Sequence, residues 1–194
     1  MNVSKNLNST EEIIKNIIRQ NINKLRELKK VFDISMEIGK FAEDMKKNAS
    51  ILADSENKGR DIIDDIADFT DKRGENIEEI KNINAAVRHH RLKLAAKYSD
   101  IIDKVEKYAK TNQNLPENNI FPAWAVNLYR LMSEQQAVLE KIRDADEKNN
   151  ELIKNLIEEL NKKTNSIKNN RILMDKFNQS GNDMPAGTFF KSKK

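Results

Sequence analysis

The sequence predicts an all-α protein, an elongated antiparallel bundle of three long, coiled-coil-like helices without a sheet. Charged residues make up 34% of the 194 residues and apolar residues only 38%, which is too few for a thick core. The 5 glycines and 3 prolines are also too few to form the many turns of a sheet protein. Long helices satisfy both limits, because each needs only one apolar stripe to pack against its neighbours.

The first helix is expected over residues 11–57, after a flexible N-terminus at residues 1–10. The segment STEE at residues 9–12 marks its start, with hydroxyl groups that can cap backbone N–H groups and carboxylates in the first turn. One apolar stripe then follows at helical spacing, through Ile14, Ile18, Ile22, Leu25, Leu28, Phe32, Met36, Phe41, Met45, Ile51 and Leu52. Gly39 lies inside the stripe and is interpreted as a tolerated residue that costs about 1 kcal/mol relative to Ala.

The second helix is expected over residues 60–111. Ile66 and Phe69 lie on one side of its first part, and a row of aspartates lies on the other. After Gly74, a candidate kink, the apolar pattern resumes at helical spacing and continues to Tyr108. The segment TNQNLPENNIFP contains two of the three prolines and predicts a loop over residues 112–122.

The third helix is expected over residues 123–177, before a flexible tail at residues 179–194. Its seam has heptad spacing, through Leu128, Leu131, Gln135, Val138, Ile142, Ala145, Asn149, Leu152 and Leu156. After Leu152 a better stripe runs through Ile153, Ile157 and Leu160, so the apolar side shifts by one residue.

The three helices are nearly equal in length, which predicts an up-down-up bundle over residues 11–178. The residues chosen for its core are Ile18, Leu25, Phe32, Ile66, Ile80, Val105, Ile142, Leu152 and Leu160. A second apolar seam would make the chain self-associate, most simply as a dimer. The polar seam residues Gln135, Asn149 and Thr164 allow the alternative that they set the register inside one chain.

Charge is distributed in two adjoining blocks of opposite sign, although the net charge is only +4. Residues 56–80 are mainly acidic and residues 81–111 mainly basic. The basic block offers a face for an anionic membrane surface, formed by Arg88, Arg91, Lys93, Lys97, Lys104 and Lys107. The alternative is a solvated face that pairs with the acidic block. Nucleic-acid binding is a third and less favoured interpretation, because Asp100, Asp103 and Glu106 interrupt the basic residues.

Two short motifs are candidate metal sites. Asp64-Asp65-Ile66-Ala67-Asp68 resembles the first aspartate-rich motif of isoprenyl diphosphate synthases, whose carboxylates hold magnesium bound to a diphosphate. That family needs a second acidic motif across a deep cavity, which the sequence lacks, so a solvated acidic face is preferred. His89 and His90 point about 100° apart on a helix and have no ligand type three or four residues away. No metal or cofactor is expected.

Aromatic residues suggest a contact surface for another protein. Phe121, Trp124 and Tyr129 gather at the start of the third helix, where they either cap the core or anchor a partner. Phe189 and Phe190 lie in the basic tail with Lys191, Lys193 and Lys194 and are too few to anchor a membrane.

The expected function is therefore non-enzymatic. No catalytic constellation, Gly-rich phosphate loop or cysteine is present in the sequence, which also excludes disulfides. No secretory signal or membrane span is expected, so the chain should be soluble, either cytoplasmic or exported without a classical signal. We expect a scaffold, adaptor or component of a larger assembly, which binds other proteins and a second copy of itself, with anionic-membrane binding as the main alternative.

Overall fold

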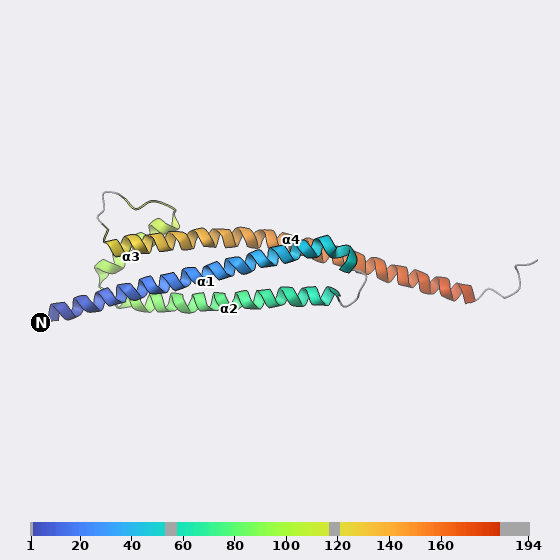
Figure 1. The fold of residues 1–194 in the computed structure, drawn as a ribbon, viewed down its shortest axis with the longest axis horizontal. Coiled ribbons are helices and arrows are strands. Elements are labelled where there is room, and N and C mark those ends of the chain that lie inside the picture. Colours follow the sequence, from blue (N-terminus) through green and yellow to red (C-terminus); the bar gives the residue numbers. More distant parts are fainter. Residues whose placement is uncertain (1, 53–57, 117–120, 183–194) are drawn as a thin grey trace, which may run out of the picture.

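The computed structural model describes residues 2–52, 58–116 and 121–182, which contain four helices and no strand (Figure 1). The helices are α1 (Asn2–Leu52), α2 (Lys58–Leu92), α3 (Ala96–Lys110) and α4 (Ala123–Asn182). The predicted all-α class is confirmed. The predicted architecture of three helices is not, because the second predicted helix is divided into α2 and α3.

Helix α1 lies between α2 and α4 and packs against both along much of its length (Figure 1). Contacts between α1 and α4 join Asn21 to Gln135 and Ser35 to Asn149, so the two helices run in the same direction. Helix α2 runs the opposite way, with the ring of Phe69 5.9 Å from that of Phe41. The bundle is thus organised around α1.

The core consists of two clusters along α1. One cluster joins α1 to α3 and α4, through Ile17, Ile102, Val105, Ala125 and Leu128. The other joins α1 to α4, through Leu25, Leu28, Val31, Val138 and Ile142. Of the nine residues chosen for the core, Leu25, Val105 and Ile142 are buried and the other six are half-buried. A narrow bundle leaves many stripe residues half-covered because few helices surround each of them.

The second predicted helix breaks at residues 93–95. Ala95 adopts an extended conformation (φ −62°, ψ 148°), after which α3 packs against α4. The segment RLKLAAK around the break lacks Gly and Pro and consists of good helix formers, so its composition predicts continuity. Burial of Ile102 and Val105 against α1 and α4 overrides that local preference.

The other helix boundaries differ less from the prediction. Helix α1 begins at Asn2, so residues 2–10, which were expected to be flexible, are helical. Helix α3 ends in a Schellman motif: Asn112 has a φ of 52°, and the N–H of Gln113 donates to the carbonyl of Tyr108 at 3.1 Å. Helix α4 extends to Asn182, beyond the predicted end. Residues 183–194 of the predicted tail, with its Phe and Lys residues, lie outside the described residues.

The apolar stripe of α1 also differs from the prediction at two positions. Ile22 and Met36 were placed in the stripe, but each is 44% exposed. The preceding residues, Asn21 and Ser35, are buried instead. Both polar residues bond to α4, so hydrogen bonding between the helices decides which residue faces inward at these two positions.

Candidate functional site

Two buried polar layers join α1 to α4. In the first, the amide of Gln135 donates to the backbone carbonyl of Asn21 at 2.8 Å and to its side-chain oxygen at 3.2 Å. In the second, the amide of Asn149 donates to the carbonyl of Ser35 at 2.6 Å. The layers are separated by two heptads on both helices, which supports the interpretation that Gln135 and Asn149 set the register within one chain. The Thr164 side chain lies outside the described residues.

An ionic contact connects the second layer to α2. The Ser35 hydroxyl donates to Asp146 of α4 at 3.0 Å, and Arg73 of α2 pairs with the same carboxylate. Because Asp146 accepts from both α1 and α2, it links three helices. This layer is therefore a structural element of the bundle.

The predicted aromatic patch lies against the first core cluster. Phe121, Trp124 and Tyr129 are half-buried and pack on its buried residues. The hydroxyl of Tyr129 donates to the carbonyl of Gln113 at 3.1 Å, which ties α4 to the loop after α3. This placement favours the interpretation that the three rings cap the core, and a partner site there stays a prediction.

The predicted basic face divides into two groups. Arg91 is half-buried and pairs with Asp103 and, at 3.1 Å, with Glu106, so it ties the end of α2 to α3. The other five predicted side chains are exposed, namely Arg88, Lys93, Lys97, Lys104 and Lys107. The ion pairs of Arg91 thus lead to α3 rather than to the acidic block.

A groove of about 400 Å³ opens where the four helices meet, beside the first polar layer. Four cationic side chains and one carboxylate line it, namely Lys24, Arg88, Arg91, Lys110 and Glu106. Met132 and Val87 supply apolar wall, and Asn84 and Gln136 supply amides. The groove has an excess of positive charge.

Charged side chains in this groove shift the pKa values of Lys24 and Glu106. Desolvation lowers the pKa of Lys24, the nearby Glu106 opposes this shift, and Lys110 reinforces it. Burial raises the pKa of Glu106, but Lys110 and Arg91 outweigh burial and hold that pKa below its ordinary value. Glu106 is 2.8 Å from Lys110 and 3.1 Å from Arg91, so its charge is shared between these two cations.

Neither Lys24 nor Glu106 is among the site residues that the sequence predicts. Lys24 nevertheless has a sequence signal, because it follows Ile17 and precedes Val31 at intervals of seven residues. Those two residues are buried in the core of α1, so a lysine interrupts their series. The position of Glu106 beside it depends on the break before α3, which the sequence did not predict.

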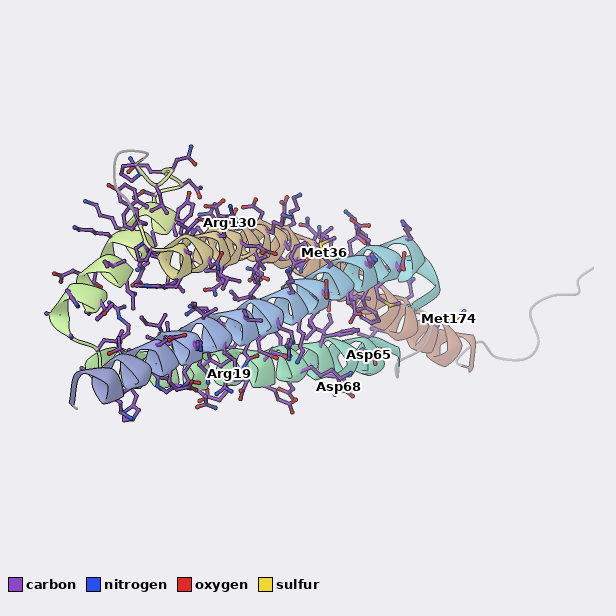
Figure 2. All side chains as sticks on the ribbon, turned by 60° about the vertical axis from the view of Figure 1, so that its left-hand side comes forward. Arg19, Met36, Asp65, Asp68, Arg130 and Met174 are labelled. Carbon is purple, nitrogen blue, oxygen red and sulfur yellow. The ribbon has the colours of Figure 1, made fainter. Side chains whose placement is uncertain are left out.

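The acidic and histidine motifs both lie on α2. Asp64, Asp65 and Asp68 are exposed on α2, and Figure 2 labels two of them on that helix. Within the described ranges, no three His, Asp or Glu side chains are grouped to hold a metal ion. His90 has a pKa lowered by burial and by Lys93, His89 and Arg19. His89 and His90 therefore lie in a basic environment that disfavours a bound cation.

Exposed apolar residues are concentrated on the C-terminal part of α4. Leu156 is the last buried residue on α4 that the structure describes. Beyond it Ile157 is 48% exposed, Ile172 52% and Met174 70%. Figure 1 shows the end of α4 projecting past the ends of α1 and α2, and Figure 2 labels Met174 on the projection.

The sequence matches no protein-family model, and no curated protein or solved structure is detectably similar to it. None of the helices in the described part of the chain has a stretch both long and apolar enough to cross a bilayer.

Proposed function

We propose that this chain is a non-enzymatic assembly protein, in which the part of α4 beyond Leu156 binds another protein chain, in the first instance a second copy of itself. The observation that carries the proposal is the exposure of Ile157, Ile172 and Met174 beyond the last buried residue of α4. In water, each of these side chains would stabilise a complex by up to about 1.5–3 kcal/mol if it became fully buried.

The sequence of α4 supports this use of its C-terminal part. Up to Leu156, seam residues spaced by three and four face α1. The following positions of that seam are Glu159, Lys163 and Ser166, which are polar. The apolar stripe meanwhile moves by one residue, to Ile157 and Leu160, and so turns about 100° around the helix. The apolar side of α4 is thereby directed to a different neighbour from α1.

Sedimentation velocity over a range of protein concentrations tests this proposal. We expect the wild-type chain to form a dimer, and the triple variant Ile157→Gln/Ile172→Gln/Met174→Gln to sediment as a monomer with unchanged helix content. The matched control is Ile22→Gln, which changes a similarly exposed apolar residue on α1. A wild-type chain that stays monomeric at all concentrations, or a triple variant that still dimerises, contradicts the proposal.

A second candidate function is binding to an anionic membrane surface. Leu92, at the corner between α2 and α3, is 86% exposed and is flanked by the exposed cations Arg88, Lys93 and Lys97. An exposed apolar side chain among lysines is a feature of helices that bind lipid headgroups.

Vesicle sedimentation tests this candidate. Binding that requires acidic lipid should be lost in the variant Lys93→Glu/Lys97→Glu/Leu92→Gln. Arg91 is left unchanged in that variant because it ties α2 to α3. Equal binding by the variant and the wild type, or no binding by either, excludes this function.

A further inference from the structure

Lys24 of α1 is a cation at a heptad position that is otherwise occupied by buried apolar residues. Ile17, Val31 and Ile38 occupy the same heptad position and are buried. A charged group loses hydration energy when it is covered by protein, and this loss is offset when an opposite charge or hydrogen-bonding partners lie beside it. A leucine at this position would pack like its neighbours, so Lys24 forgoes stabilising apolar burial.

The protein supplies little negative charge to compensate Lys24. The one carboxylate lining the groove, Glu106, is already 2.8 Å from Lys110 and 3.1 Å from Arg91. Among the ion pairs of the described residues, none includes Lys24 or Arg88, which line the same groove. The groove therefore contains two cations without an ion-pair partner, Lys24 and Arg88. They lie beside two cations, Arg91 and Lys110, that pair with Glu106.

The break between α2 and α3 forms this groove. Beyond the break, α3 packs against α4, and Glu106, Ala109 and Lys110 line the same groove as Lys24 and Arg88. Residues from all four helices line the groove. Its volume of about 400 Å³ is within the range of small-molecule sites.

We propose that this groove binds a small, multiply charged anion that carries phosphate groups, with Lys24 and Arg88 as its direct cationic contacts. Arg91 and Lys110, held by Glu106, add positive potential to the wall. Charge-assisted hydrogen bonds from amines and guanidinium groups to phosphate oxygens are among the strongest that side chains form. The amide of Asn84 also lines the groove and adds a donor for such an anion, whereas the amide of Gln136 donates to Glu140 at 3.3 Å.

Titration calorimetry with sodium pyrophosphate at near-physiological salt tests the proposal. We expect one saturable site on the wild-type chain, and a loss of at least about tenfold in affinity in Lys24→Leu and in Arg88→Gln. The matched control is Arg26→Gln, an exposed arginine of α1 two residues from Lys24, which should bind as the wild type does.

Lys24→Leu also separates binding from folding. Because leucine suits this heptad position, the variant should keep its helix content and unfold at a Tm raised by about 4 °C, while its affinity for pyrophosphate falls. No saturation of the wild type by about 1 mM pyrophosphate overturns the proposal. Equal affinity in Lys24→Leu and wild type also overturns it, because scattered surface cations would then hold the anion.

Vesicles distinguish a free phosphate compound from a lipid headgroup. If vesicles that contain phosphatidylserine compete with pyrophosphate and lose their binding in Lys24→Leu, the groove takes a headgroup. If pyrophosphate binds the wild type and vesicles do not compete, the groove takes a soluble compound. Vesicle binding that persists in Lys24→Leu, together with no pyrophosphate binding, overturns the groove as the anion site and assigns lipid contact to the exposed lysines.

Discussion

Two glycines, one in α1 and one in α2, show how the same residue type can lie in opposite surroundings. A Cβ atom on Gly39 would lie 2.6 Å from the side-chain oxygen of Asn149, whereas a Cβ on Gly74 would meet nothing within 4 Å. Asn149 cannot withdraw freely, because its amide donates to Ser35 at 2.6 Å in a buried layer. Gly39 is therefore needed for close packing, and its interpretation as merely tolerated was incomplete.

Substituting the two glycines by alanine should have effects of opposite sign on stability. Gly39→Ala should lower the free energy of unfolding by about 1–3 kcal/mol, because overpacking against Asn149 exceeds the gain in helix propensity. Gly74→Ala should raise it by about 0.5–1 kcal/mol, because the site is open. Urea unfolding followed by circular dichroism measures both.

The double variant Gly39→Ala/Asn149→Ala provides the control for this pair. Removing the Asn149 side chain should make Gly39→Ala much less harmful than it is alone. If Gly39→Ala stabilises the chain as much as Gly74→Ala does, the close approach of Asn149 to α1 is wrong.

At the scale of the helices, the decisive feature is the interruption between α2 and α3. Ala95 precedes α3 with no side-chain cap, and both Ala95 and Ala96 are exposed, so solvent can satisfy the first N–H groups of α3. Arg91 then joins the two helices by pairing with Asp103 and Glu106. The groove depends on this interruption, because a continuous helix would carry Glu106 away from Lys24.

A proline scan across the interruption should distinguish two helices from one. Ala96 is the first residue of α3, where proline is favoured, and the extended conformation of Ala95 suits the residue before a proline. We expect Ala96→Pro to change the free energy of unfolding by less than about 1 kcal/mol, against a cost of about 3 kcal/mol or more for the control Ala86→Pro inside α2. Chemical denaturation measures both; equal, large losses would mean that the helix is continuous.

At the scale of the whole molecule, the parallel pairing of α1 with α4 sets the shape. Both polar layers have the same separation along the two helices, so the pairing is a single register over two heptads. Helix α2 covers another side of α1, and α4 continues past the bundle (Figure 1). The same register thus determines which part of α4 is left for another chain.

Engineered cysteines can test this register, because the natural chain has none. The Cγ of Asn149, whose position the sulfur of a cysteine would take, lies 3.6 Å from the Cβ built on Gly39, so Gly39→Cys/Asn149→Cys should form an intramolecular disulfide on oxidation. In the control Gly39→Cys/Gln135→Cys, the second cysteine lies about 21 Å further along the bundle and should remain reduced. Non-reducing gel mobility and thiol titration report the outcome; a disulfide in the control pair alone would show a different register.

The sequence by itself determined the all-α class, the start of α4 at Ala123 and the polar seam positions Gln135 and Asn149. These features depend on the local spacing of apolar residues and on the scarcity of Gly and Pro, both of which are properties of the sequence alone. The sequence also marked Arg88 and Arg91 as basic residues of interest, without their neighbours.

Only the tertiary structure decided where the second predicted helix breaks and that Glu106 lies near Lys24. It also decided that Asn21 and Ser35 are buried in place of Ile22 and Met36. A helix turns about 100° per residue, so adjacent positions on a broad stripe compete for the interior, and local spacing ranks them poorly. The choice is made by the partner helix, through the hydrogen bonds and apolar contacts that each register allows.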